Sequence, residues 1–262
     1  MLQQVVDIVK EASGQMLAAH FTVTQKEGFA NLVTSSDLAV QHFLTERLSA
    51  LLPGCGFLCE EEDFRRTERE YIWIIDPIDG TANYARGLSD CCISVALVRG
   101  GEVQLGVVYS PRREELYTAE RGKGACCNGR PIRVSGRPLA DGLFCTAMST
   151  YRKAFAKTCS DIIYEIYMRC NDVRRWGSAA VELCLLASGV IELYFEMRLQ
   201  PWDYAASMLI LREAGGYIAG WNGGTPSLTR PSLVIAANRR DSLDAMLATV
   251  RTHLPDGLPY TD

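Results

Sequence analysis

Histidine is scarce in this chain, and long basic runs and long apolar runs are missing. The three histidines among 262 residues, His20, His42 and His253, lack the spacing of a metal site. The formal net charge is −4 and no basic run exceeds a few residues, so binding to nucleic acid through bulk charge is not expected. No apolar run is long enough for a membrane span. We therefore expect neither a nucleic-acid partner nor a membrane partner.

Cysteine, by contrast, occurs ten times, but its spacing is not that of a disulfide framework or a zinc site. Cys91–Cys92 and Cys126–Cys127 are adjacent pairs rather than C-x-x-C motifs. Cys145 and Cys184 lie in apolar stretches and are expected to be small buried side chains. The first residues have no positively charged segment followed by an apolar core, so no signal peptide is predicted. Together these features favour a reduced, cytoplasmic compartment.

The first half of the chain, residues 1–138, is predicted to pack helices on a mostly antiparallel sheet. Apolar residues at helical spacing from Val5 to Ala19 predict a first helix. Segment 31–36 is polar and turn-like, and Ser36 is the expected N-cap of a second helix, which Pro53–Gly54 ends. Gly100–Gly101 predicts a two-residue hairpin. The strands expected in this half are 56–59, 72–75, 93–98, 103–109, 114–119 and 132–134.

The second half, residues 139–262, alternates helical and strand patterns, which indicates a layered α/β arrangement. The expected strands are 143–148, 173–176, 190–195 and 233–237. The expected helices are 155–169, 178–187, 202–214 and 242–253. No internal repeat is visible, and the length suits one large domain or two packed halves.

The chemistry is concentrated where the apolar strand 72–75 ends. Asp76 and Asp79 follow it with a proline between them, and Gly80 and Thr81 come next. Carboxylate oxygens from one strand end suit Mg²⁺, Gly80 lets the backbone approach a ligand, and the Thr81 hydroxyl can hold a water or a phosphate oxygen. Metal and phosphate at one place suit phosphoryl transfer. The alternative is an ordinary turn, because Asp-Pro and Asp-Gly are common turn pairs.

Four other acidic residues are candidates for the same site, and each also has a structural interpretation. Asp37 opens the second helix and Asp203 begins a later one, so both are equally suited to capping a helix. Glu60 ends a strand, but it begins an acidic run that is typical of a solvated loop. Glu196 is expected at a strand end, where it can pair with Arg198. Sequence spacing alone does not bring these residues together.

Four motifs in order resemble the inositol monophosphatase family, whose members are Mg²⁺-dependent, lithium-sensitive phosphatases. The matching segments are Asn31–Asp37, Glu60–Glu61, Trp73–Asn83, and Trp202–Ser207 with Glu213–Gly216. The resemblance covers nearly the whole chain. It implies a layered α/β sandwich of alternating α-β-α-β-α layers, of the sugar-phosphatase type, in one compact catalytic unit that works as a homodimer.

The resemblance also implies the ligands of two or three Mg²⁺ ions. The first ion would be bound by Glu60, Asp76 and the Ile78 carbonyl. The second would be bound by Asp76, Asp79 and Asp203. Asp37 would hold a weaker third ion through water.

The substrate contacts follow from the same resemblance. Thr81 and Glu60 would orient the attacking water, and the N–H groups of Gly80 and Thr81 would bind the phosphate. Lys26 would lie near the phosphate. The polyol would be bound by Asp79, Ala179, Glu196 and Asp203.

The implied reaction is hydrolysis of myo-inositol 1-phosphate to inositol and phosphate by direct attack of a metal-activated water. Fructose 1,6-bisphosphate and 3′-phosphoadenosine 5′-phosphate are alternative substrates, and a non-catalytic relative that acts as a binding partner is a further alternative. Cys59, Ala82 and Ser207 depart from the family pattern, but none replaces an expected metal ligand. A non-catalytic relative would be expected to lose at least one of Glu60, Asp76, Asp79, Thr81 and Asp203, and all five are present.

Overall fold

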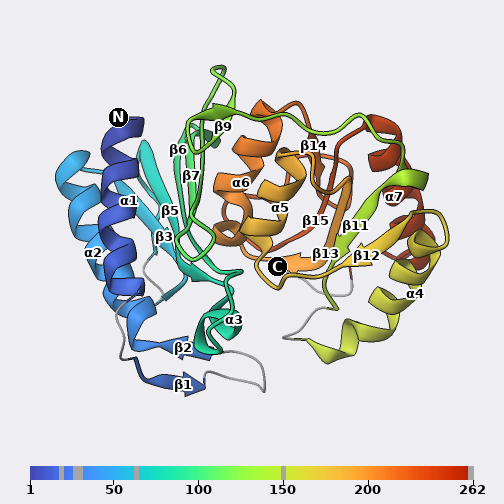
Figure 1. Cartoon of the computed structure of the whole chain (residues 1–262), viewed down its shortest axis with the longest axis horizontal. Coiled ribbons are helices and arrows are strands. Elements are labelled where there is room, and N and C mark those ends of the chain that lie inside the picture. Colours follow the sequence, from blue (N-terminus) through green and yellow to red (C-terminus); the bar gives the residue numbers. More distant parts are fainter. Residues whose placement is uncertain (18–20, 26–31, 62–64, 149–151, 259–262) are drawn as a thin grey trace.

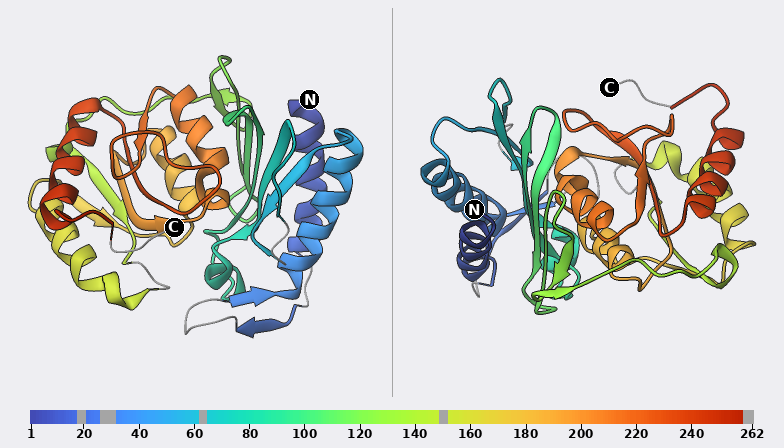
Figure 2. Two further views of the ribbon diagram at one scale, coloured as in Figure 1. Left: turned by 180° about the vertical axis from the view of Figure 1, so that it is seen from behind. Right: turned by 90° about the horizontal axis from the view of Figure 1, so that it is seen from above.

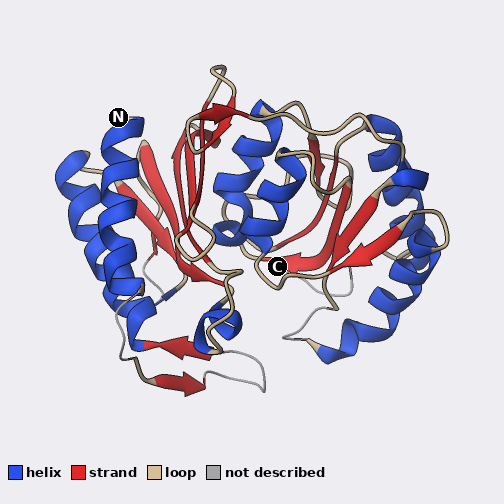
Figure 3. Cartoon of the chain, in the orientation of Figure 1, coloured by secondary structure: helices blue, strands red, loops and turns tan. Residues whose placement is uncertain are grey.

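Five layers alternate between helices and sheets (Figures 1 and 3). The computed structural model of the protein describes residues 1–17, 21–25, 32–61, 65–148 and 152–258. An outer pair of helices, an eight-stranded sheet, a central pair of helices, a five-stranded sheet and a second outer pair follow one another. The pairs are α1 (Leu2–Met16) with α2 (Ser35–Leu51), α5 (Ala179–Ala187) with α6 (Pro201–Glu213), and α4 (Ala156–Tyr167) with α7 (Arg240–His253). The predicted α-β-α-β-α sandwich is confirmed.

The eight-stranded sheet is antiparallel except at one pair, β3 and β5, which run parallel. Its order is β10-β9-β8-β7-β6-β5-β3-β4. The predicted Gly100–Gly101 hairpin is confirmed, since both glycines have positive φ and Arg99 pairs with Glu102. The strands are β3 (Gly56–Cys59), β4 (Arg65–Arg66), β5 (Tyr71–Asp79), β6 (Cys92–Arg99), β7 (Glu102–Ser110), β8 (Glu115–Glu120), β9 (Ala125–Cys127) and β10 (Arg130–Pro131).

The five-stranded sheet is mixed, as expected for the second half. Its order is β12-β11-β13-β15-β14, with β11 parallel to both neighbours and the remaining pairs antiparallel. The strands are β11 (Leu143–Thr146), β12 (Asp172–Arg174), β13 (Leu193–Leu199), β14 (Tyr217–Ala219) and β15 (Ser232–Ala237). A separate antiparallel pair, β1 (Val23–Gln25) and β2 (Leu32–Thr34), lies beside the short helix α3 (Thr81–Ala85) (Figure 1).

Both sheets are covered on both faces, which explains their nearly continuous apolar strands. In β5, Trp73 and Ile75 face the outer helices, whereas Ile74 faces the central helices. In β15, Leu233 and Ile235 face the far helices, whereas Val234 faces the central ones. The central pair of helices is therefore packed between the two sheets, and Figure 2 shows it from two further sides.

Several boundaries predicted in the first half are wrong. The N-cap of α2 is Thr34 rather than Ser36, because Thr34 and Asp37 form a reciprocal capping box. Leu32–Thr34, predicted as part of a turn, is strand β2. Segment 132–134 is not a strand; Asn128–Gly129 instead turns the chain into the β9–β10 hairpin, because Asn-Gly suits the positive φ angles of such a turn.

In the second half the main error concerns β13. The strand spans Leu193–Leu199 rather than 190–195, so Glu196 lies inside it and not at its end. The buried and half-buried residues alternate from Glu196 to Leu199, so a strand with one polar face continues beyond the apolar run. Strand β14 was not predicted.

Some predictions lie outside the described residues, namely those on Ala19, Lys26 and Asn31. All ten cysteines are free, and Cys145 and Cys184 are fully buried, as predicted. In the described ranges, no helix has the length and apolarity to cross a bilayer. The division of the chain at 138/139 stays a prediction.

Helix α6 packs so closely on β7 that one position there has room only for glycine. A Cβ on Gly106 would lie 2.6 Å from the carbonyl oxygen of Ala206. We expect Gly106→Ala to lower the free energy of unfolding by about 1–3 kcal/mol, since either the strand or the helix must move. Urea unfolding measures the change. Gly136→Ala, at a site with no heavy atom within 4 Å, is the matched control, and equal effects of the two substitutions would contradict this packing.

Candidate active site

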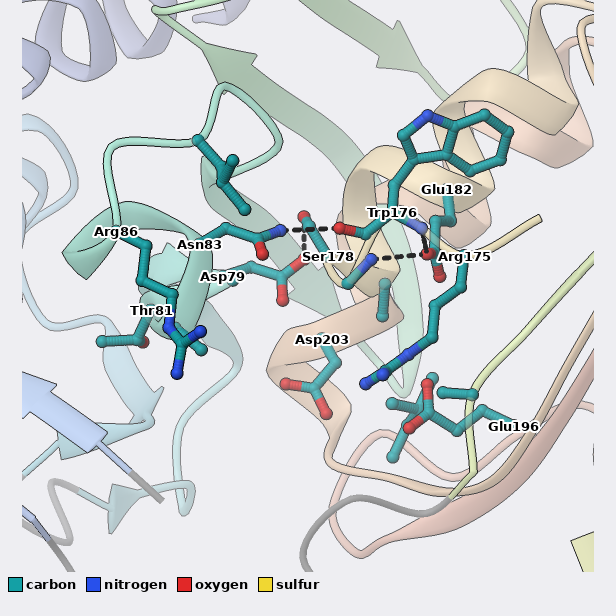
Figure 4. Close-up of a pocket in the computed structure, with 17 residues that line it drawn as sticks. Asp79, Thr81, Asn83, Arg86, Arg175, Trp176, Ser178, Glu182, Glu196 and Asp203 are labelled. Atoms are coloured by element: carbon teal, nitrogen blue, oxygen red, sulfur yellow. Dashed lines mark hydrogen bonds between the residues drawn. The ribbon is translucent and has the colours of Figure 1, made fainter. Parts of the chain in front are cut away.

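A cavity of about 550 Å³ opens between the two sheets, at the N-terminal ends of the central helices α5 and α6 (Figure 4). Its walls come from the end of β5 and α3, from the turn before α5, from β13 and from the start of α6. Most polar lining residues are acidic or basic rather than neutral. The labelled ones are Asp79, Thr81, Asn83, Arg86, Arg175, Trp176, Ser178, Glu182, Glu196 and Asp203.

The end of β5 places Asp76 and Asp79 by means of an irregularity in the sheet. Pairing with β6 shifts register between these two residues, and the proline between them has no N–H to contribute to the ladder. Such bulges bend a strand and re-aim its side chains. Glu60 is brought alongside, because β3 runs parallel to β5 and the Glu60 N–H donates to the Ile75 carbonyl over 3.2 Å.

The start of α5 binds Asp79. Its Oδ2 accepts hydrogen bonds from the Ser178 hydroxyl, at 2.6 Å, and from the Ala180 N–H, at 2.7 Å. Ser178 is also the N-cap of α5. Burial raises the pKa of Asp79, whereas these donors lower it. A helix N-terminus therefore stabilises the charge of this carboxylate.

Gly80 is confined by the protein itself. Its φ is +84°, and a Cβ there would lie 2.8 Å from the Asp90 carbonyl oxygen and 3.1 Å from the Ser178 Cβ. Protein atoms therefore require a glycine here, and the approach of its backbone to a ligand stays a prediction. Thr81 follows, and its hydroxyl lies 3.0 Å from the Ile78 carbonyl oxygen and 3.3 Å from Asp37 Oδ1.

Four carboxylates share this region and repel one another; Asp76 and Asp79 are buried, and Glu60 and Asp203 are half-buried. Burial raises the pKa of Asp76 well above its ordinary value, and the charges of Glu60, Asp79 and Asp203 raise it further. Burial also raises the pKa of Asp203, and the negative charges of Asp79 and Glu60 raise it further. Asp76 is 1% exposed, and its Oδ1 has no hydrogen-bond partner among the described residues. Like charges in low dielectric are costly unless a cation compensates them.

This donor set fits a hard cation. The side chains supply only carboxylate oxygens, which Mg²⁺ prefers, and one of them is buried and unsatisfied. Within the described part of the chain, however, no three Asp, Glu, His or Cys side chains already converge as a metal site. Instead, one oxygen of each of Asp79 and Asp203, Oδ2, accepts hydrogen bonds from protein N–H or O–H groups. We conclude that the residues fit a cation whose binding would draw the carboxylates together.

Asp37 and Asp203 both cap helices, as their alternative interpretation predicted. Asp203 accepts the Gln200 N–H at 2.7 Å in the first turn of α6, and it also faces the cavity. Asp37 is fully buried and accepts the Thr34 N–H at 2.8 Å. Capping therefore does not separate these residues from the site, because Asp37 also contacts Thr81.

Glu196 faces the cavity from within β13. It accepts a hydrogen bond from the Tyr194 hydroxyl at 2.8 Å. Its pKa is raised to about 8, mainly by burial and then by the charge of Glu182, while the positive charge of Arg175 lowers it. Ala179 lines the same wall. The structure thus brings Asp79, Ala179, Glu196 and Asp203 to one cavity, as the family resemblance implied.

Sequence reasoning missed part of the cavity wall. Arg86, Arg175 and Trp176 gave no signal as single residues. Asn83 lay within the first motif without a role of its own. Glu182 did have a signal, since it is the one charged residue of the apolar run 179–187.

Comparison with known proteins gives this geometry a context. The sequence model of the inositol monophosphatase family matches residues 1–254. The Nus factor SuhB of Escherichia coli (strain K12) is 34% identical over 253 residues, which cover 94% of each chain. The inositol-1-monophosphatase of Mesorhizobium japonicum is 35% identical over 229 residues, which cover 85% of this chain and 86% of that protein.

Solved structures agree with the sequence relatives. The extragenic suppressor protein suhB of Bartonella henselae superposes with a TM-score of 0.87 at 30% identity, covering 95% of this chain and 97% of that one. An IMPase/NADP phosphatase complexed with Mg²⁺ and phosphate superposes with a TM-score of 0.83 at 25% identity, covering 95% of both chains. From its sequence and its fold, this chain belongs to the inositol monophosphatase family.

Proposed function

We propose that the protein is a Mg²⁺-dependent phosphatase that hydrolyses myo-inositol 1-phosphate to inositol and phosphate. One observation carries the proposal: the group of buried Asp76 and Asp79 with half-buried Glu60 and Asp203, in which an Asp76 oxygen lacks a partner among the described residues, beside a polar cavity. A protein with no cation to bind there would gain stability by losing these charges. Family membership and the relative solved with Mg²⁺ and phosphate support the same reaction class.

The residues that would hold the cations are those at the end of β5 and their neighbours. Glu60, Asp76 and the Ile78 carbonyl would bind the first ion, and Asp76, Asp79 and Asp203 the second. Asp37 would hold a third ion through water. When bound, Mg²⁺ neutralises the phosphate charge, lowers the pKa of a bound water and stabilises the leaving alkoxide.

The chain itself positions the reactants. Glu60 and the Thr81 hydroxyl would orient the attacking water. The Thr81 hydroxyl can itself donate a hydrogen bond to Asp37 Oδ1, 3.3 Å away. The N–H groups of Gly80 and Thr81 would bind the phosphate. The water then attacks phosphorus as the ester bond breaks, with no covalent intermediate on the protein.

The polyol would lie against Asp79, Ala179, Glu196 and Asp203, which line one cavity. Because the pKa of Glu196 is raised to about 8, both its protonated and its ionised form are accessible near neutral pH. A carboxyl group in either state can hydrogen-bond a ring hydroxyl, as donor or as acceptor. The Tyr194 hydroxyl donates a hydrogen bond to Glu196, whereas the sequence offered the neighbouring Arg198 as its partner.

One observation favours a second substrate class. Arg86 and Arg175 line the cavity, whereas the sequence offered only Arg198 as a basic group near Glu196. Guanidinium groups suit a second phosphate, so sugar bisphosphates and 3′-phosphoadenosine 5′-phosphate are the alternatives to test. A panel of these substrates with inositol 1-phosphate, measured on purified protein with Mg²⁺, decides among them.

A non-catalytic role is the remaining alternative, because the E. coli relative carries the name Nus factor. The intact carboxylate group argues against it, and so does the 35% identity to an inositol-1-monophosphatase. The homodimer, the cytoplasmic location, the lithium sensitivity and the lack of a nucleic-acid partner stay predictions from sequence.

Metal dependence is the first prediction. Excess chelator is expected to abolish phosphate release from inositol 1-phosphate, and added Mg²⁺ to restore it, because Arg86 and Arg175 can bind a phosphate but cannot lower the pKa of a water as bound Mg²⁺ does. A malachite-green assay for released phosphate measures this. Full activity in excess chelator would refute the mechanism.

Asp76→Asn tests the charge cluster through opposite effects on activity and stability. We expect kcat/KM to fall by a factor that corresponds to a loss of on the order of 3 kcal/mol or more in transition-state stabilisation, because a metal ligand loses its charge. In the absence of metal, the free energy of unfolding of the variant should nevertheless exceed that of the parent by on the order of 1 kcal/mol, because a repulsive charge is gone.

The control is Asp161→Asn, on a half-buried α4 residue whose side chain pairs with the exposed Lys157; neither quantity should move there beyond about 0.5 kcal/mol. Thermal unfolding in chelator and steady-state kinetics supply the two readings. If Asp76→Asn lowered the stability of the metal-free protein, the assumed repulsion among these carboxylates would be wrong.

Glu196→Ala tests substrate choice. Removing a hydrogen-bonding group from a site built for it discriminates against the cognate substrate. We expect kcat/KM for inositol 1-phosphate to fall about tenfold more than that for p-nitrophenyl phosphate, which has no ring hydroxyl to lose a partner. If both monoesters change by the same small factor, Glu196 does not contact the polyol.

A further inference from the structure

Glu182 is a buried carboxylate in the cavity wall that the proposed chemistry does not use. It lies in the first turn of α5 and is 1% exposed, and every other residue of that helix is apolar. Burying a carboxylate is costly unless its oxygens are hydrogen-bonded. The contacts of Glu182 therefore show what its burial achieves.

One oxygen of Glu182 holds the turn that precedes α5. Its Oε1 accepts the N–H of Trp176 at 2.6 Å and the N–H of Gly177 at 2.8 Å. Figure 4 shows both bonds beside the cavity. Two adjacent backbone groups are thus bound by a single buried atom, which fixes the orientation of both peptide planes.

The opposite side of the same turn is bound by α3. The Asn83 Nδ2 donates to the Trp176 carbonyl at 2.6 Å and to the Asp90 carbonyl at 2.7 Å. At Gly177 φ is +86°, and a Cβ there would lie 3.2 Å from the Asn83 amide nitrogen. The turn is therefore clamped between Glu182 in the second half of the chain and Asn83 in the first.

The residue that leaves this turn is the one that holds Asp79. Ser178 follows Gly177 directly and donates to Asp79 Oδ2 at 2.6 Å, and the Ala180 N–H donates to the same oxygen at 2.7 Å. Displacing the turn would move the Ser178 hydroxyl and the first N–H groups of α5 together. Asp79 would then lose the partners that set the direction of its carboxylate.

We propose that Glu182 is a positioning residue, which orients Asp79 for cation binding by clamping turn 176–178. This inference rests on the proposed function, since it assumes that Asp79 is a ligand. Glu182 acts through backbone hydrogen bonds and need not touch the cation or the substrate. The acceptor oxygen, rather than the negative charge, is what the turn requires.

The test compares Glu182→Ala with Glu182→Gln. Glutamine keeps the acceptor oxygen and loses the charge, whereas alanine loses both. We expect Glu182→Ala to weaken Mn²⁺ binding to the metal-free protein about tenfold, and Glu182→Gln to stay within about threefold of the parent. Titration followed by electron paramagnetic resonance measures binding without activity. In turnover, Glu182→Ala should raise the Mg²⁺ concentration for half-maximal rate more than it raises KM.

Glu192→Ala is the matched control. Glu192 is also 1% exposed and accepts a backbone N–H, that of Leu143 at 2.7 Å, but it does not line the cavity. Its loss should lower stability and leave Mn²⁺ binding unchanged. If Glu182→Ala does not fold, Asn83→Ser releases the other side of the turn and should weaken Mn²⁺ binding in the same direction.

The outcomes separate this inference from the proposed function. If the parent protein binds no Mn²⁺, the proposed function fails. If the parent binds Mn²⁺ and a folded Glu182→Ala binds it equally well, the positioning role fails alone. The role also fails if Glu182→Gln behaves like Glu182→Ala, because charge would then matter rather than the hydrogen bonds, or if Glu192→Ala weakens binding as much.

Discussion

Mutual repulsion among buried carboxylates is the constraint around which this site is arranged. Asp76 lies within reach of the charges of Glu60, Asp79 and Asp203, and its pKa is raised by burial and by all three. The parallel pairing of β3 with β5 and the register shift in β5 are what bring these residues together. Like charges concentrated in the interior lower the stability of the folded protein, so stability alone does not explain this arrangement. The cost is understandable if a cation is the missing partner.

Helix N-termini offset part of that cost. Asp37 lies in the first turn of α2, Asp203 lies in the first turn of α6, and Asp79 accepts an N–H from the start of α5. The positive end of a helix stabilises a nearby carboxylate. Three helices from two layers, α2 of an outer pair and α5 and α6 of the central pair, therefore point their N-termini at one region. The layered architecture is in this sense the means by which a single site receives three such helix ends.

The sequence allowed the local part of this arrangement to be predicted. The run from Ile72 to Thr81 predicted a buried strand with candidate cation ligands at its end, although β5 extends through Asp79, and the alternation of elements predicted the layers. The predicted boundaries of helices and strands were wrong where a helix cap or a turn, rather than the apolar pattern, decides the structure, as at Thr34 and at Asn128–Gly129. The contacts between distant segments could not be predicted from spacing. Ser178 and Asp79 are 99 residues apart, and the packing of α5 against the eight-stranded sheet brings them together.

The most direct measurement is the anomalous diffraction of Mn²⁺ in crystals of the protein. If the carboxylates form a cation site, anomalous density will lie among Glu60, Asp76, Asp79 and Asp203 and will be absent in Asp76→Asn. The carboxylates should also move closer to one another than they are in the metal-free protein. Density confined to surface acidic residues, or unchanged density in Asp76→Asn, would contradict the account.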